Sequence, residues 1–355
     1  MKTTKLITSA IVGASILGLS TLSAQATDYK MTAGSSHPPI VPWAKQLKDL
    51  VVPETAARAA KLGHSIKWVE AYSGALYDFK ETLEGVEDGR ADVGWVGTLW
   101  ETNKMPLHNV TFFAPFGSTS ASANIAIMNE MYKTIPELDQ QWTKHNQKLL
   151  GYFAGDEYVL LTKKPINTME DLKGLQIFAP GAIGRWLEGT GATGVNGGLP
   201  VYYDGVKKGT ADGVISPGTG ILPFKLFEVA PFVTRLQLGA SLPGGLTMNL
   251  DTWKKLEPEM QQMFLDIGAE WSKTVTAQVD GFSAKTFQIL EKNPNVTVST
   301  FPEAEMKKWA AAVPDIAGDW AKSVEAKGLP ANAMLKAYME GVRKSGQTPL
   351  RDWDK

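Results

Sequence analysis

The residue types that carry most acid–base and metal chemistry are scarce in this sequence, and their spacing does not bring them together. The 355 residues include four histidines and no cysteine, and no two histidines have the spacing of the zinc motif H-E-x-x-H. A chain without cysteine forms neither disulfides nor thiolate metal sites. The sequence therefore predicts no metal site and no cofactor.

Two short motifs resemble catalytic or cofactor-binding fingerprints but lack the context that these need. The segment VISPG (214–218) has Val214 where the nucleophile elbow requires glycine, so the strained turn that would expose Ser216 is not specified. The segment GTGATG (189–194) matches G-x-G-x-x-G, but it follows helix-like residues, whereas the dinucleotide fingerprint follows a strand and opens a helix. We therefore predict that the chain is not an enzyme.

An acidic pair, Asp156 and Glu157, interrupts the stretch GYFAGDEYVLLTKKPI (151–166), which otherwise has the pattern of a strand. Strand interiors usually avoid carboxylates. The residues alone leave two interpretations open: both side chains are solvated in a turn, or a carboxylate is placed there to hold a ligand.

Aromatic side chains gather at or near the predicted strand ends and the turns after them: Tyr72, Trp95, Trp100, Tyr152, Phe178, Trp186, Tyr202 and Tyr203. In open α/β sheets, ligands bind beyond the carboxyl ends of the strands. Core packing accounts for any single ring, but several rings at equivalent strand ends favour a lined cleft. The pattern therefore predicts a binding site without catalytic groups.

Strand-like and helix-like segments alternate in the first part of the chain. Strand patterns at 28–34, 64–72 and 91–97 are separated by helix patterns at 43–62 and 76–89. This order predicts a parallel sheet that is covered by helices.

The alternation restarts after residue 150, and the last third of the chain, about 251–345, is mostly helical. Residues 250–292 have the pattern of one very long helix, with Pro258 in its first turns, and 296–302 has the pattern of a strand. No long polar linker separates the two halves. We therefore expect two α/β lobes that are joined by strands or helices crossing between them.

The first residues have the organisation of a secretory signal peptide. Two lysines precede an apolar run from Leu6 to about Leu19, and small residues at a cleavage site end at Ala26. The apolar run is short for a membrane span. We therefore predict export to the periplasm with cleavage after Ala26, and no lipid anchor, because no cysteine is present to carry one.

The remaining chain, about 330 residues, is long for a single core and suggests two domains. Its net charge changes from −1 to −3 when Lys2 and Lys5 are removed, and this near-neutral balance argues against a nucleic-acid partner. With 43% hydrophobic residues, the chain can build large cores without disulfides.

Four stretches together resemble the solute-binding subunit of tripartite ATP-independent periplasmic (TRAP) transporters, the DctP family, over nearly the whole exported chain. They are SGALYDFKETLEGVEDGRADVGW (73–95), KKPINTMEDLKGLQIFAP (163–180), YYDGVKKGTADGVISP (202–217) and MNLDTWKKLEPEMQQMF (248–264). The second and third carry the most specific part of the resemblance.

The resemblance implies an α/β, two-lobe periplasmic-binding-protein (Venus-flytrap) fold with lobe-crossing strands and a long spanning helix. Residues 27–150 with about 235–275 would form lobe I, residues 151–234 with about 276–345 would form lobe II, and 346–355 would be a C-terminal tail. It also implies capture of a small molecule in the cleft and delivery to the membrane permease subunits, without catalysis. We expect a monomer.

The sequence departs from the family pattern where the resemblance implies that arginines hold a ligand carboxylate. Phe178 occupies the position of the arginine that ends the strand after DLKG. Glu157 lies, within a residue or so, at the position of a second arginine before KPI. A cleft changed in this way would repel an organic acid and attract an ammonium ion.

We therefore predict a small cationic solute, such as an amino alcohol of the ethanolamine type or a quaternary amine. The predicted ligand-binding residues are Glu157, Phe178, Trp95, His37, Tyr72, Tyr203 and Arg185. Arg185 is included as a substitute cation, because the first alternative is the same transporter role with a carboxylate or sulfonate ligand. A periplasmic enzyme and a ligand-sensing receptor subunit are alternatives of another class.

Overall fold

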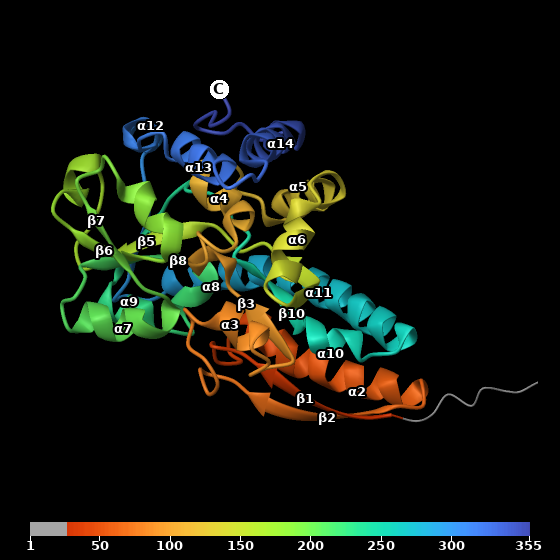
Figure 1. Cartoon of the computed structure of the whole chain (residues 1–355). Coiled ribbons are helices and arrows are strands. Elements are labelled where there is room, and N and C mark those ends of the chain that lie inside the picture. The colour runs from red at the N-terminus through yellow and green to blue at the C-terminus, as the bar shows by residue number, and fades with distance from the viewer. Residues whose placement is uncertain (1–26) are drawn as a thin grey trace, which may run out of the picture.

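The computed structural model describes residues 27–355, so the predicted signal peptide and its cleavage site lie outside the described residues. Two β-sheets form the centres of two lobes, and the 33-residue helix α11 (Pro258–Leu290) extends along both (Figure 1). This arrangement confirms the predicted two-lobe α/β fold with a long spanning helix. Among residues 27–355, no helix is long and apolar enough to cross a membrane.

The first sheet has the strand order β2-β1-β3-β10-β4. Its strands are β1 (Asp28–Gly34), β2 (Ser65–Ala71), β3 (Val93–Val96), β4 (Gln147–Phe153) and β10 (Gly244–Asn249). β1 pairs in parallel with β2 and β3, as the sequence pattern predicts, but β10 lies antiparallel between β3 and β4. The strands predicted at 28–34, 64–72 and 91–97 are therefore parallel, as expected, and the strand that returns from the second lobe enters this sheet in the opposite direction.

The second sheet has the strand order β11-β9-β5-β8-β6-β7. Its strands are β5 (Tyr158–Thr162), β6 (Gln176–Ala179), β7 (Thr193–Asn196), β8 (Gly213–Pro217), β9 (Phe232–Arg235) and β11 (Thr297–Thr300). β5 is antiparallel to both of its neighbours, β8 and β9, whereas β6 pairs in parallel with β7 and β8. The strand that enters from the first lobe is thus the antiparallel one here too.

Two segments connect the sheets: residues 154–157 lead from β4 to β5, and residues 236–243 lead from β9 to β10. They run side by side, since the backbone N–H of Gly155 donates to the carbonyl of Ser241 at 2.8 Å. We call them the crossing segments. The predicted lobe boundaries near 150 and 235 lie close to the crossing segments. The exact division of the chain into lobes stays a prediction.

The predicted helix at 43–62 forms in three parts, α1 (Pro42–Gln46), a π-helical turn (Leu47–Val51) and α2 (Val52–Lys61). Pro53 lies in the first turn of α2, directly after the π-helical turn, where its missing N–H interrupts the hydrogen-bond pattern of a continuous helical path. Proline therefore divides this helix without ending it.

The predicted long helix at 250–292 is divided in the same way. α10 (Leu250–Lys254) ends before α11 begins, and Pro258 lies in the first turn of α11. α11 packs against β4, α1 and α2 of the first lobe and against α8 (Gly218–Ile221) and β11 of the second. A single rigid element thus supports both lobes.

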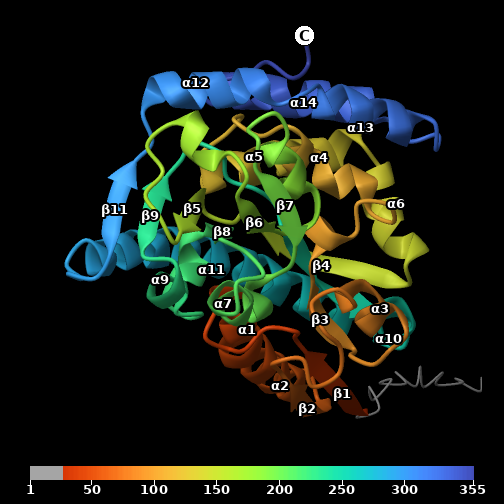
Figure 2. The same cartoon turned by 90° about the vertical axis from the view of Figure 1, so that its left-hand side faces the viewer.

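The C-terminal helices cover the side of the molecule opposite to α2 (Figures 1 and 2). α12 (Glu303–Ala312), α13 (Ile316–Glu325) and α14 (Ala331–Lys344) form this layer together with α4 (Val110–Phe113) and α5 (Ala121–Thr134). The indole N–H of Trp320 donates to the carbonyl of Pro106 at 3.1 Å, and that of Trp186 donates to the carbonyl of Phe112 at 2.6 Å. These bonds tie segments far apart in the sequence.

The other α-helices are α3 (Thr82–Glu87), α6 (Glu137–Lys144), α7 (Leu199–Lys207) and α9 (Leu226–Val229). 3-10 helices occupy Thr98–Trp100, Pro106–Asn109, Met169–Leu172 and Gly181–Leu187.

Candidate functional site

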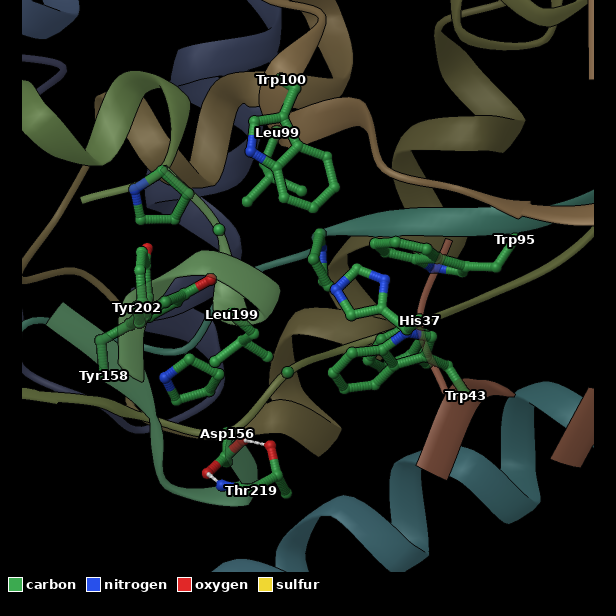
Figure 3. Close-up of a pocket in the computed structure, with 16 residues that line it drawn as sticks. His37, Trp43, Trp95, Leu99, Trp100, Asp156, Tyr158, Leu199, Tyr202 and Thr219 are labelled. Carbon is green, nitrogen blue, oxygen red and sulfur yellow. Dashed lines mark hydrogen bonds between the residues drawn. The ribbon is translucent and has the colours of Figure 1, made fainter. Parts of the chain in front are cut away.

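A cavity lies between the two lobes (Figure 3). From the first lobe it is lined by His37, Trp43, Trp95, Leu99, Trp100 and Phe153. From the crossing segments and the second lobe it is lined by Gly155, Asp156, Tyr158, Pro180, Gly198, Leu199, Tyr202, Pro217, Thr219 and Pro243. A ligand in this cavity would contact both lobes at once.

Three tryptophans surround the imidazole of His37 on the first-lobe side of the cavity. The centroid of the His37 ring lies 5.4 Å from that of Trp43, 5.3 Å from that of Trp95 and 6.1 Å from that of Trp100. The rings of Trp95 and Trp100 meet at an interplanar angle of 86°. This wall therefore presents ring faces and ring edges in different directions.

The local sequence explains why these rings meet. Trp95 lies in β3, and a Cβ atom at Gly97 would overlap the ring of Trp100, so glycine lets that indole fold back over the strand end. His37 comes shortly after β1, which is the parallel neighbour of β3. Adjacent parallel strands end at the same edge of a sheet, where ligands of α/β proteins bind.

Burial keeps His37 neutral. Its side chain is 1% exposed, and the loss of water around it lowers its pKa to about 3. Its Nδ1 lies 3.0 Å from the hydroxyl oxygen of Ser36, which fixes the orientation of the ring. His37 therefore adds a polar group to the cavity but no positive charge near neutral pH.

Asp156 is the carboxylate among the residues that line the cavity. It is 5% exposed and accepts hydrogen bonds from the backbone N–H of Thr219 at 2.9 Å and from the Thr219 hydroxyl at 2.8 Å. Burial raises its pKa to about 6, although hydrogen bonds from Thr219 and Ser283 act in the opposite direction. Asp156 is thus no solvated turn residue, and neutral donors hold it.

The rest of the described cavity wall contains no lysine or arginine. Three prolines contribute carbon surface and no backbone N–H. Three neutral donors of lining residues, Trp43 Nε1, Trp95 Nε1 and the Tyr202 hydroxyl, are buried and have no hydrogen-bond partner among residues 27–355. The site therefore combines one buried acid, aromatic surface and a few unused neutral donors.

Of the predicted site residues, the structure brings Trp95 and His37 to the cavity, but not Glu157. Glu157 lines a second hollow together with Arg235. Burial raises the pKa of Glu157 to about 7, and the charge of Arg235 acts in the opposite direction. Successive side chains of an extended segment point to opposite sides, so Asp156 occupies the place predicted for Glu157.

Phe178, at the position matched to the family arginine, also lies outside the cavity lining. The same is true of Arg185, which follows it in the sequence. The Phe178 ring is buried and stacks on that of Tyr202, with centroids 5.3 Å apart, so it supports a lining residue from behind. Arg185 Nε lies 2.9 Å from a carboxylate oxygen of Glu188, and its Nη2 lies 3.1 Å from one of Asp319. Its charge is therefore paired with these two carboxylates and not directed into the cavity.

The two remaining predicted residues lie away from the cavity lining as well. The hydroxyl of Tyr72 donates to Glu70 at 2.7 Å, and that of Tyr203 donates to Glu228 at 3.1 Å. Tyr203 is on α7 next to Tyr202, which does line the cavity. The helical periodicity turns the two tyrosines in different directions.

Sequence reasoning missed Asp156, Trp43, Phe153 and Thr219 as lining residues. A signal existed for Trp43, because it follows the first strand within a few residues of His37. Phe153 and Asp156 lie in the stretch that drew attention for its acidic pair, but the direction of each side chain depends on the crossing geometry. Nothing in the sequence around Thr219 indicates that it binds a distant carboxylate.

Comparison with known proteins gives a family match. The model of the bacterial extracellular solute-binding proteins of family 7 (DctP) matches residues 36–323. The ectoine-binding periplasmic protein TeaA of Halomonas elongata is 22% identical over an alignment of 361 residues, which covers 98% of this chain and 100% of the relative.

Solved structures share the fold. A TRAP solute-binding protein from a marine metagenome, in complex with metahydroxyphenylacetate, superposes with a TM-score of 0.78 at 22% identity, covering 90% of this chain and 100% of the other. A TRAP periplasmic solute-binding protein from Bordetella bronchiseptica, with bound (R)- and (S)-mandelate, gives a TM-score of 0.75 at 20% identity, covering 89% and 99%. At these identities the likeness shows the fold.

Proposed function

The chain belongs to family 7 of the bacterial extracellular solute-binding proteins, the DctP family of TRAP transporters, and we propose that it captures a small cationic solute between its lobes. Such proteins bind small ligands in the periplasm and work with membrane permease subunits, and they are not enzymes. In our proposal the solute is an amino alcohol or a quaternary amine, and the mature protein is a monomer that begins after Ala26.

The observation that carries the proposal is the charge of the cavity. Asp156 is buried at the wall, and the described lining offers no lysine or arginine to balance it. A carboxylate that neutral donors hold gains most from a cation placed beside it. Trp43, Trp95 and Trp100 add ring surface, and each cation–π contact is worth about 0.5–2 kcal/mol, depending on desolvation.

The crossing segments suggest how capture changes the shape of the protein. Asp156 belongs to one crossing segment and binds Thr219 at the start of α8, while the tryptophans belong to the other lobe. A ligand that contacts both walls stabilises the closed arrangement, which is a hinge motion. Closure also excludes water and so strengthens the pairing of Asp156 with a cation.

An organic-acid ligand is the second candidate, and the relatives favour it. The structures described above hold metahydroxyphenylacetate and mandelate, and others of this fold hold galacturonate and benzoate. None of these ligands is an amine, so these relatives support the acid alternative better than the predicted cation. The unused donors Trp43 Nε1, Trp95 Nε1 and the Tyr202 hydroxyl offer such an acid hydrogen bonds, but Asp156 would repel it.

A ligand-sensing receptor subunit would use the same cleft as a transporter subunit and differ in its docking partner. The presence of genes for the two membrane subunits of a TRAP permease beside this gene would favour transport. For the enzyme alternative, turnover of a bound compound would be the supporting observation; no group of three or more side chains that could hold a metal ion occurs among residues 27–355.

A thermal-shift panel of amines, quaternary amines, carboxylates, sulfonates and ectoine tests the proposed ligand class. A ligand present at 100 times its dissociation constant raises the free energy of unfolding by about 2.7 kcal/mol. We expect compounds that carry a cation to raise the melting temperature. If carboxylates and sulfonates alone raise it, the cationic proposal is wrong and the acid alternative takes its place.

A further inference from the structure

We propose that the cavity is selective for an N-methylated ammonium group, as in choline or a betaine, over a primary ammonium. This inference rests on the proposed cationic ligand and narrows it to one chemistry. The argument starts from hydrogen bonds: a primary ammonium has three N–H donors that need acceptors once water is excluded, whereas a trimethylammonium has none.

Acceptors in the cavity are few. Asp156 already accepts hydrogen bonds from the backbone N–H and the hydroxyl of Thr219, and Ser283 also bonds to it. Three tryptophans, Leu199 and prolines form much of the remaining wall. The other side-chain acceptors of the lining are the imidazole of His37 and the hydroxyls of Tyr158, Tyr202 and Thr219. A primary ammonium needs three acceptors in suitable directions at once, whereas a methylated one keeps the charge attraction to Asp156 without needing a hydrogen bond.

The shape of the wall fits the same group. In Figure 3, Trp100 lies on one side of the cavity, His37, Trp43 and Trp95 lie on a second side, and Asp156 lies on the opposite side with Thr219. A methylated ammonium spreads its charge over its methyl groups, which can contact the rings while the buried Asp156 attracts the charge from the opposite wall. Aromatic cages recognise quaternary ammonium ions by this combination of contacts.

The unused donors indicate what the rest of the ligand carries. Trp43 Nε1, Trp95 Nε1 and the Tyr202 hydroxyl have no hydrogen-bond partner within residues 27–355. An oxygen on the ligand would satisfy one of them. The hydroxyl of choline and the carboxylate of glycine betaine both supply such an oxygen, so the methylated ammonium is the shared chemistry and the test distinguishes the two sources.

Calorimetry with a methylation series measures the selectivity: ethanolamine, N-methylethanolamine, N,N-dimethylethanolamine and choline, with glycine betaine as a second source. The neutral isostere 3,3-dimethylbutan-1-ol controls for shape, because it replaces the charged nitrogen by carbon. We expect affinity to rise with each methyl group and choline or glycine betaine to bind at least about tenfold more tightly than ethanolamine. The neutral isostere should bind at least about tenfold more weakly than choline.

The Thr219→Val variant provides a second measurement. It removes the hydroxyl that donates to Asp156 and so leaves an acceptor site for an ammonium N–H. The preference for choline over ethanolamine should therefore fall by about tenfold, the value of one hydrogen bond to a charged group. Ser283→Ala should act in the same direction and covers the case in which Thr219→Val does not fold.

The outcomes separate this inference from the proposed function. If ethanolamine binds as tightly as choline or more tightly, the preference for methylated ammonium is wrong while the cationic ligand stands. If the neutral isostere binds as well as choline, shape and not charge is recognised, and both statements fail. Both also fail if acids bind and no member of the series does, or if none of these compounds binds.

Discussion

Asp156 and Glu157 are neighbours in one crossing segment, yet they lie in different surroundings. Asp156 lines the aromatic cavity and is held by the N–H and hydroxyl of Thr219. Glu157 lines a second hollow, where the charge of Arg235 opposes the effect of burial on its pKa. The charge of Arg235 acts on Glu157, whereas no lysine or arginine lines the cavity beside Asp156. In our proposal, Asp156 and not Glu157 therefore sets the charge that a ligand meets.

The largest difference in ligand affinity is expected between two variants, each of which removes one of these carboxylate charges. Asp156→Asn should weaken binding of a cationic ligand by about 100-fold or more, because a desolvated charge pair is worth several kcal/mol. Glu157→Gln should change the affinity by less than about threefold, because Glu157 lines the second hollow and not the aromatic cavity, and a charge interaction weakens with distance. Calorimetry of both variants with the same ligand measures the difference.

Circular dichroism spectra of the two variants provide the control for folding. Equal losses of affinity in the two well-folded variants would remove the distinction between the two carboxylates. A tighter complex of an organic acid with Asp156→Asn than with the unchanged protein would instead favour the acid alternative.

The pH dependence of binding comes next in size. The pKa of Asp156 is raised by burial to about 6, so the carboxylate of the free protein becomes protonated as the pH falls below that value. Affinity for a cation should therefore fall by about tenfold between pH 7 and pH 5, whereas affinity for an acid should rise. Calorimetry over this range measures the sign directly.

The Asp156→Asn variant should lose this pH dependence and Glu157→Gln should keep it, which assigns the titration to one carboxylate. A profile that Glu157→Gln flattens would place the titrating group in the second hollow. A permanently charged quaternary amine is the suitable ligand, because its own charge does not change over the range.

The sequence predicts the two-lobe fold better than it predicts the directions in which the side chains of Asp156 and Glu157 point. The alternating pattern indicates two α/β lobes, and the resemblance to a family supplies the crossing strands and the spanning helix. Trp95 and His37 follow from strand ends alone, because parallel neighbours end at one edge. The choice between Asp156 and Glu157 requires the twist of the crossing segment, and a shift of one residue reverses the direction of every side chain.

Other site residues could not be predicted, for a related reason. Phe178 is at the expected position but turns toward Tyr202, behind the wall, because the packing of α7 on its strand decides where the ring goes. Thr219 meets Asp156 across 63 residues of sequence, and such pairings follow from the tertiary fold alone. Composition and spacing carry no information about them.

The aromatic wall should show a smaller effect than the carboxylate. Trp100→Leu removes one ring face from the cavity and should weaken cation binding by about tenfold, which corresponds to about 1.4 kcal/mol. Trp253→Leu is the matched control, because that ring lies outside the cavity lining with Lys148 over it at 5.8 Å. Tryptophan fluorescence or calorimetry measures both, and a similar effect of the two substitutions would contradict a specific role for the wall.

The smallest expected effect concerns the stability of the unliganded protein at the second hollow. The pKa of Glu157 is raised by burial to about 7 in the folded state, from 4.5. The folded protein therefore binds this proton more tightly than the unfolded chain, and stability from this group is present below about pH 4.5 and is lost as the pH rises through 7. At pH 8 the carboxylate is charged and partly buried beside Arg235.

Glu157→Gln removes that charge and should raise the free energy of unfolding by up to about 1 kcal/mol at pH 8 and by nothing measurable at pH 4. Urea unfolding of the unchanged protein and the variant at both pH values provides the test. Because the charge of Arg235 also acts on Glu157, Arg235→Gln together with Glu157→Gln isolates the burial effect. A variant that is less stable at pH 8 would mean that attraction to Arg235 outweighs burial, and the second hollow would then be held together by an ion pair that the first cavity lacks.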